Sequence, residues 1–258
     1  MEKNNKEYFE DTNLIVGRNP VMEVLRSDRE VECIYLLSGD RKGPLNKIYA
    51  MAKDRKIPVK DITSDRLTTM TKNENHQGVA ALISAANYGT MEDIYKKAGD
   101  EPLFVIIADE IEDPHNLGAI IRTAESCGAH GIIIPKRHSA GLTSTAVKAS
   151  AGAVFHIPIV RVPNIVSAIE ELKKDGMWFY CADMDGQNWS GVDYSGKVGL
   201  IVGSEGFGVS RLVKEKCDFT VSLPMLGKVN SLNASVAAGI VMYEITRQRQ
   251  NIKAINKG

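Results

Sequence analysis

Apolar residues occur along this chain in short runs that alternate with stretches of helical periodicity, a pattern typical of an α/β protein. In the first third, the pattern predicts strands over 31–37, 57–62 and 78–83, and helices over 44–53 and 64–72. A further helix is expected to begin with Asn19 as its N-cap, followed by Pro20, and to end near Leu25. We therefore predict a small α/β domain over residues 13–86.

The rest of the chain has longer apolar runs, which predict six strands beginning at Leu103, Gly131, Val154, Met177, Val198 and Phe219. Near-continuous apolar strands separated by helices are typical of a parallel sheet that is buried on both faces. A last helix is expected over 231–249, with Asn230 and Ser231 as its cap. We predict that 102–258 is a second domain, that 87–101 is a linker with one short helix from Thr90, and that 1–12 is a polar tail.

Composition narrows the class of protein. The chain has 258 residues, 43% hydrophobic and 25% charged, which predicts a soluble globular protein and excludes disorder and a coiled coil. The 32 basic and 32 acidic residues balance, so attraction to nucleic acid must come from local patches. Residues 41–60 form one such patch, and another lies between Ser126 and Ile169, where no Asp or Glu occurs. Both are also compatible with ordinary solvated surface.

The start of the chain is polar and acidic, and no apolar run approaches the roughly 18 residues that span a bilayer, so we expect a cytoplasmic protein without a membrane partner. The four cysteines and five histidines lack metal-ligand spacing, so we expect neither a metal nor a disulfide framework.

The segment from Gly191 resembles a P-loop, but Val198 stands where Ser or Thr is required. No GxGxxG motif follows the first strand of the second domain, which disfavours a dinucleotide-dependent oxidoreductase.

Three segments place polar residues and glycines at the ends of apolar strands, where open α/β sheets bind ligands. In the first, DPHNLGAIIRTAES, Asn116 is expected to cap a helix on which Arg122 lies away from the apolar face. In the second, GSEGFG, three glycines surround Glu205 and allow close approach of a ligand to the backbone. In the third, LPMLGKVNSLNAS, Asn233 is predicted to lie along a mostly apolar helical stripe and to need hydrogen-bond partners.

Each segment also has a plainer interpretation. Arg122 would then be a surface arginine paired with Glu125 or Glu205, the glycine-rich bend a tight strand-to-helix turn, and Asn233 a satisfied core asparagine.

With the three segments in this order, the chain resembles, over about 103–250, the SpoU/TrmH group of the SPOUT superfamily. These enzymes methylate ribose 2′-hydroxyls of RNA with S-adenosylmethionine. The first domain, with GRNPVMEVL from Gly17, looks like the RNA-binding domain of RlmB-type enzymes, which modify a guanosine of large-subunit (23S) ribosomal RNA. The resemblance implies a C-terminal sheet tied in a trefoil knot, which strand patterning would not predict. It also implies a homodimer that places residues of one subunit beside the cofactor of the other.

The resemblance also assigns residues. Those that match the catalytic positions of the family are Asn116, Arg122, Glu205, Ser231 and Asn233. Those expected to surround the cofactor are Ala182, Gly203, Leu223, Met225 and Leu232. Ala182 departs from the many relatives that carry Thr, so no side-chain hydroxyl contacts the cofactor there.

The guanidinium of Arg122 is a poor base, because arginine stays protonated in proteins. We therefore expect it to hold the target phosphate and to stabilise the nascent alkoxide, while the proton leaves to phosphate or water. Glu205 would orient Arg122 or Asn116, and Ser231 and Asn233 would shape the site.

Two alternative functions stay open at this point. One is a 2′-O-methyltransferase that acts on transfer RNA, because the residues alone do not separate the two substrates. The other is a non-catalytic RNA-binding factor in ribosome assembly, against which the full polar set argues, since a pure binding protein would not require it.

Overall fold

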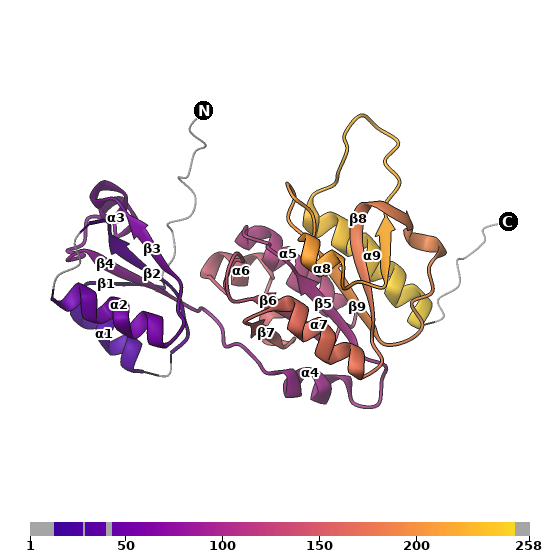
Figure 1. Cartoon of the computed structure of the whole chain (residues 1–258), viewed down its shortest axis with the longest axis horizontal. Coiled ribbons are helices and arrows are strands. Elements are labelled where there is room, and N and C mark those ends of the chain that lie inside the picture. Colours follow the sequence, from indigo (N-terminus) through magenta and orange to yellow (C-terminus); the bar gives the residue numbers. More distant parts are fainter. Residues whose placement is uncertain (1–12, 28, 40–42, 251–258) are drawn as a thin grey trace. The chain divides into compact units, whose positions relative to one another are not determined.

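The computed structural model describes residues 13–27, 29–39 and 43–250 (Figure 1). The predicted polar tail, 1–12, lies outside the described residues, as do the first residues of the basic segment, Arg41 and Lys42. The chain divides into two compact units: unit 1 comprises Met1–Asn87 with Gly141–Thr145, and unit 2 comprises Tyr88–Ala140 with Ala146–Gly258. The domain limits drawn from the sequence stay a prediction.

Unit 1 is built on a four-stranded sheet in the order β1-β4-β2-β3. Its elements are β1 (Leu14–Val16), α1 (Arg18–Arg26), β2 (Val31–Leu37), α2 (Pro44–Asp54), β3 (Val59–Ile62), α3 (Ser64–Met70) and β4 (Val79–Ile83). Ala81 of β4 packs in a cluster with α1 and α2, whereas its neighbour Ala80 packs with α3. Because successive side chains of a strand point to opposite faces, the sheet has helices on both sides.

The first helix differs from the prediction at its start. Its N-cap is Gly17, with φ of 95°, and not Asn19. Pro20 still lies in the first turn, where its missing N–H leaves no helical hydrogen bond unmade.

The six-stranded sheet of unit 2 has the order β10-β8-β9-β5-β6-β7, and all its paired strands are parallel, as predicted. From Tyr88 onward the helices and main strands are α4 (Met91–Ala98), β5 (Phe104–Ala108), α5 (Pro114–Ser126), β6 (Gly131–Pro135), α6 (Ser144–Ala149), β7 (Ile159–Val162), α7 (Ile165–Lys174), β8 (Trp178–Asn188), β9 (Val198–Val202), α8 (Arg211–Lys214), β10 (Phe219–Ser222) and α9 (Ala234–Arg249).

Helices cover both faces of this sheet. Val105 of β5 belongs to the cluster formed by α4, α7 and α8. Its neighbour Phe104 points the other way, where the guanidinium of Arg249 on α9 lies 5.6 Å from its ring. α9 in turn packs against α5. Every residue of β5 is therefore buried, as its unbroken apolar sequence indicates.

Two predicted elements begin later than expected. Val154 and Phe155, predicted to open a strand, lie in a 3-10 helix, and β7 starts only after Pro158, which has no N–H to donate to a sheet. The last helix begins at Ala234 rather than Ser231, because the side chain of Asn233 accepts hydrogen bonds from the N–H groups of the first turn and so acts as the N-cap.

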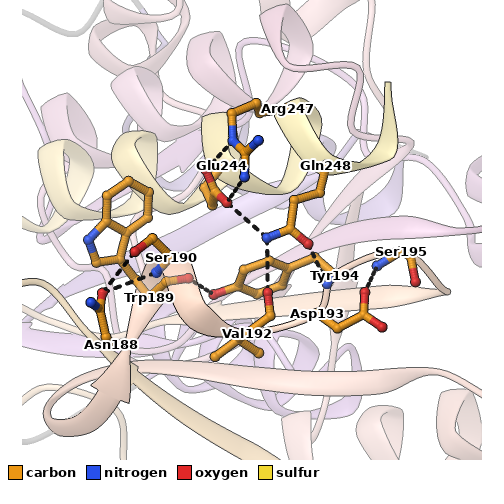
Figure 2. Close-up of polar contacts among 10 residues, drawn as sticks. All are labelled: Asn188, Trp189, Ser190, Val192, Asp193, Tyr194, Ser195, Glu244, Arg247 and Gln248. Carbon is orange, nitrogen blue, oxygen red and sulfur yellow. Dashed lines mark hydrogen bonds and ion pairs between the residues drawn. The ribbon is translucent and has the colours of Figure 1, made fainter. Parts of the chain in front are cut away.

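The C-terminal half of α9 fixes the segment that joins β8 to β9 (Figure 2). The Gln248 amide donates to the carbonyl of Val192 and accepts from the N–H of Tyr194, both at 2.9 Å. Buried Glu244 accepts hydrogen bonds from Arg247 at both carboxylate oxygens, and these bonds lower the pKa of Glu244. α9 is thus held at its far end, and this determines where Asn233 lies.

His130, which directly precedes β6, is a buried polar residue of unit 2. Its Nδ1 accepts a hydrogen bond from the N–H of Phe104 at 3.0 Å. Burial lowers the pKa of His130 below the usual value for histidine, against a smaller opposing effect of Glu101. The neutral ring is therefore the form that the fold selects.

We expect acid to destabilise unit 2 through His130. Below a pH of about 6.5, His130 takes up a proton in the unfolded chain but stays neutral in the folded chain. The free energy of unfolding therefore falls as the pH is lowered, by at most about 1.4 kcal/mol per pH unit. In His130→Asn, whose amide oxygen can accept from Phe104, this loss between neutral and mildly acidic pH should shrink. Urea unfolding followed by tryptophan fluorescence measures it, since both tryptophans, Trp178 and Trp189, lie in unit 2. An identical pH dependence in the variant and the original protein would contradict this.

Candidate active site

The strands β8, β9 and β10 share one carboxyl edge. Cys181 of β8 pairs with Ile201 of β9 on one side and with Thr220 of β10 on the other. Three residues that the family resemblance assigns to the cofactor lie within three positions after these paired residues: Ala182, Gly203 and Leu223. All three therefore lie on the side of a parallel sheet where ligands bind.

The loop after β9 is a closed turn. Ser204 and Gly208 exchange two backbone hydrogen bonds, of 3.0 and 2.9 Å. A Cβ atom on Gly203 would collide with the backbone of Gly208, so only glycine fits at this position. The far end of the loop is fixed by buried Asp109, which directly follows β5 and accepts a hydrogen bond from the N–H of Ser210 at 2.9 Å.

Sequence reasoning missed Asp109. The available signal was an acidic residue directly after an otherwise apolar strand, at the edge where the site was expected.

Three of the predicted catalytic residues meet in one hydrogen-bond cluster. The Asn116 amide donates to Glu205 Oε1 at 3.2 Å. The Asn233 amide donates to Asn116 Oδ1 at 2.9 Å and also to Glu205 Oε1. The cluster joins the first turn of α5, the loop after β9 and the start of α9, which are far apart in the sequence.

The caps of α5 and α9 explain how these amides become available. Asn116, predicted to be the N-cap of α5, is not the cap: Asp113 is, accepting from the N–H of His115 at 2.9 Å. Asn116 lies in the first turn, where its side chain is free to reach Glu205. Asn233 acts both as cap and as cluster member, because Oδ1 accepts from the first turn of α9 while Nδ2 donates to the cluster.

The other two predicted catalytic residues do not join this cluster. The side chains of Arg122 and Ser231 are exposed and make no hydrogen bond or ion pair within the part of the chain that the structure describes. Arg122 follows Asn116 by six residues, which places it about 120° away around the helix axis. Neither Glu125 nor Glu205 pairs with Arg122, so the plainer interpretation of it as an ion-paired arginine does not hold here.

Arg122 instead lies beside an open, mainly apolar groove between α5 and α9. The groove is lined by Ala119, Thr123, Ser235, Val236, Gly239, Ile240 and Tyr243. Arg122 is next to Thr123 in the chain and one turn after Ala119, so it lies at the rim of this groove. Val236 is 50% exposed and Tyr243 is 56% exposed.

The residues at the carboxyl edge fit S-adenosylmethionine, the cofactor that the resemblance implies. The segment between β10 and α9 projects from the rest of unit 2 (Figure 1) and exposes apolar side chains: Met225, Leu226, Val229 and Leu232. Such side chains can cover an adenine ring. In the neighbouring loop, the Ser204 hydroxyl is buried and has no hydrogen-bond partner among the described residues, so a ligand at this edge could supply one.

Within residues 13–27, 29–39 and 43–250, no group of three or more His, Cys, Asp and Glu side chains is arranged to bind a metal ion. No helix in these ranges combines the length and apolarity that crossing a membrane requires.

Comparison with family models gives two matches. Residues 103–243 match the SpoU rRNA Methylase family. Residues 14–89 match a family described as RNA 2′-O ribose methyltransferase substrate binding.

Individual relatives agree with these matches. A Bacillus subtilis protein, YacO, is assigned by name to the TrmH family of tRNA/rRNA methyltransferases and is 45% identical over 242 residues, covering 92% of this chain and 96% of its own. An rRNA methyltransferase from Sinorhizobium meliloti, solved with bound AdoMet, is 25% identical with a TM-score of 0.58, covering 93% of this chain and 88% of its own. The SpoU methyltransferase AviRb from Streptomyces viridochromogenes shares the fold, with a TM-score of 0.59, 24% identity, and coverage of 92% and 90%.

Proposed function

Because the chain belongs to the SpoU rRNA methylase family and is an S-adenosylmethionine-dependent RNA 2′-O-methyltransferase, we propose that its substrate is a guanosine of 23S ribosomal RNA. The catalytic part of the proposal rests on the cluster of Asn116, Glu205 and Asn233 at the carboxyl edge of the sheet. Two names support ribosomal RNA: the family that matches residues 103–243 is described as SpoU rRNA Methylase, and the Sinorhizobium relative is by name an rRNA methyltransferase. The match of residues 14–89 to a substrate-binding family supports RNA as the substrate.

The cofactor would be held by the backbone around Gly203 and Leu223, with Met225 and Leu232 against its adenine. When bound, it supplies a methyl group on a sulfonium centre, which the ribose 2′-oxygen takes up as that oxygen gives up its proton. The closed turn after β9 keeps its backbone groups in place before any ligand arrives, which reduces the entropy lost on binding.

Glu205 and the two asparagines position the reacting groups. Glu205 Oε1 accepts from both amides, while its second oxygen, Oε2, has no partner among the described residues. Because the cluster contains no cation, Oε2 is free to accept a hydrogen bond from a guanidinium or from the ribose hydroxyl.

Arg122 would supply the positive charge that this cluster lacks. A guanidinium stays protonated, so it does not act as the base. It would instead donate hydrogen bonds to the target phosphate and stabilise the negative charge that develops on the 2′-oxygen. The proton would leave to phosphate or to water.

Arg122 would reach this position from a second copy of the chain. Within its own subunit it lies on another side of α5 from Asn116 and has no side-chain partner among the described residues. It stands at the rim of the apolar groove between α5 and α9, whose Val236 and Tyr243 are exposed. A homodimer that buries this groove would bring the Arg122 of each subunit toward the partner's site.

The substrate proposal is tested with tritiated S-adenosylmethionine and two unmodified RNA pools. We expect methyl transfer to 23S ribosomal RNA, and mass mapping should place the methyl group on the ribose of a guanosine. Transfer RNA transcripts should take up no label. Labelling of transfer RNA with unlabelled 23S RNA would overturn the substrate assignment and leave the enzyme class intact.

We expect Arg122→Ala to lower methyl transfer by about 100-fold or more, the typical effect of removing one donor that stabilises developing charge. Binding of S-adenosylmethionine, measured by calorimetry, should not change, because Arg122 is separate from the loops assigned to the cofactor. Arg211→Ala, at an exposed arginine of α8, serves as the control and should stay active. Turnover near that of the original protein in Arg122→Ala would refute this role.

A further inference from the structure

The acid-free stretch between Ser126 and Ile169 includes two exposed cations, Lys136 and Arg137, that follow directly after β6. Neither side chain makes a hydrogen bond or an ion pair with any described residue. With Arg161 of β7, they form what we call the basic edge.

Several other cations around this sheet have carboxylate partners. The pairs are Lys173 with Asp218, Lys214 with Asp183 and Asp185, Lys216 with Glu170, Arg211 with Glu215, and Arg247 with Glu244. In the same loop His138 lies 3.9 Å from Glu112, but neither Lys136 nor Arg137 pairs with a carboxylate among the described residues. Exposed positive charges of this kind attract polyanions.

The basic edge lies at the same end of the sheet as the active site. β6 pairs in parallel with β5, so Lys136 leaves the sheet at the carboxyl edge from which α5 and Asn116 also begin. The loop 136–140 is joined to the connection before α5, because the N–H of Ala140 donates to the carbonyl of Ile111 at 2.7 Å.

The backbone of the basic edge is held in place. The N–H of Lys136 donates to the carbonyl of Val162 at 2.9 Å, and the Arg161 guanidinium donates to the carbonyl of Lys136 at 3.4 Å. That guanidinium also lies over the ring of Tyr88, at 4.8 Å. The side chains of Lys136 and Arg137 therefore extend into solvent from a backbone that is held in place, which limits the entropy lost when they bind.

We propose that Lys136 and Arg137 bind backbone phosphates of the RNA substrate on unit 2, beside the target nucleotide. This inference rests on the proposed function for the identity of the polyanion, and it adds a phosphate-binding surface on the catalytic unit itself. Phosphate contacts of this kind carry no sequence information, but they fix the register and orientation of the nucleic acid. Flexible exposed cations without internal partners suit that task, because binding breaks no existing ion pair.

The test compares Lys136→Gln/Arg137→Gln with a control of the same charge change, Lys174→Gln/Lys197→Gln, in the full chain. Lys174 ends α7 and Lys197 directly precedes β9, so the control lies at the opposite, amino edge. Binding of polyuridine is measured from about 50 to 200 mM salt, which makes the result independent of the natural substrate. The slope of log K against log salt is negative, and its magnitude should be smaller by about 1.4 in the test variant than in the control. Each of the two single-strand phosphate contacts contributes about 0.7.

Two further measurements separate the outcomes. The variant should bind S-adenosylmethionine normally and should methylate 23S RNA with a higher KM and an unchanged kcat. Equal salt slopes in the test and control variants would overturn the proposal. A test variant that loses binding to polyglutamate but keeps binding to polyuridine would also overturn it, because that result would indicate an acidic protein partner. Failure of the unsubstituted protein to methylate 23S RNA would instead contradict the proposed substrate, and the polyuridine comparison would still decide the basic edge.

Discussion

One carboxylate oxygen holds three distant segments of this chain together. Glu205 Oε1 accepts hydrogen bonds from Asn116 of α5 and from Asn233 at the start of α9. The contact requires that β5 and β9 leave the sheet side by side, that the loop after β9 stay closed, and that α9 start where it does. Asp109 fixes that loop, and Gln248 fixes the far end of α9. The candidate active site is therefore a consequence of parallel strands that share one edge.

The sequence predicts the architecture well because burial on both faces leaves an unambiguous apolar pattern in strands such as β5 and β9. It predicts the caps poorly. Asn116 and Asp113 are both good N-cap residues, and Pro114 in the first helical position favours Asp113. Asn116 bonds instead to Glu205, which lies 89 residues away. The local pattern holds no information about Glu205 as the partner of Asn116. For Asp109 it shows only an acidic residue directly after an apolar strand, and does not reveal its bond to the N–H of Ser210. The trefoil knot and the homodimer stay expectations that rest on the family resemblance, since strand order alone would suggest an ordinary sheet.

Charge is distributed in a way that suits an anionic substrate. Several cations around the sheet are paired with carboxylates, and such surface pairs contribute little to stability. Arg122, Lys136 and Arg137 make no such pairs within the described residues. Under our proposals, the first completes the partner's active site and the other two guide the RNA backbone toward it. The same carboxyl edge would then bind the cofactor, position the ribose and orient the phosphates.

The central claim is that Arg122 acts across a dimer on the cluster of Asn116, Glu205 and Asn233. Heterodimers of Arg122→Ala and Glu205→Ala chains, purified through two different tags, test it most directly. Neither parent should be active, but each mixed dimer holds one site with an intact Glu205 and an intact Arg122 from the partner. The account predicts about half the methyl transfer of the unsubstituted dimer, one working site in place of two. Mixed dimers as inactive as both parents would contradict it.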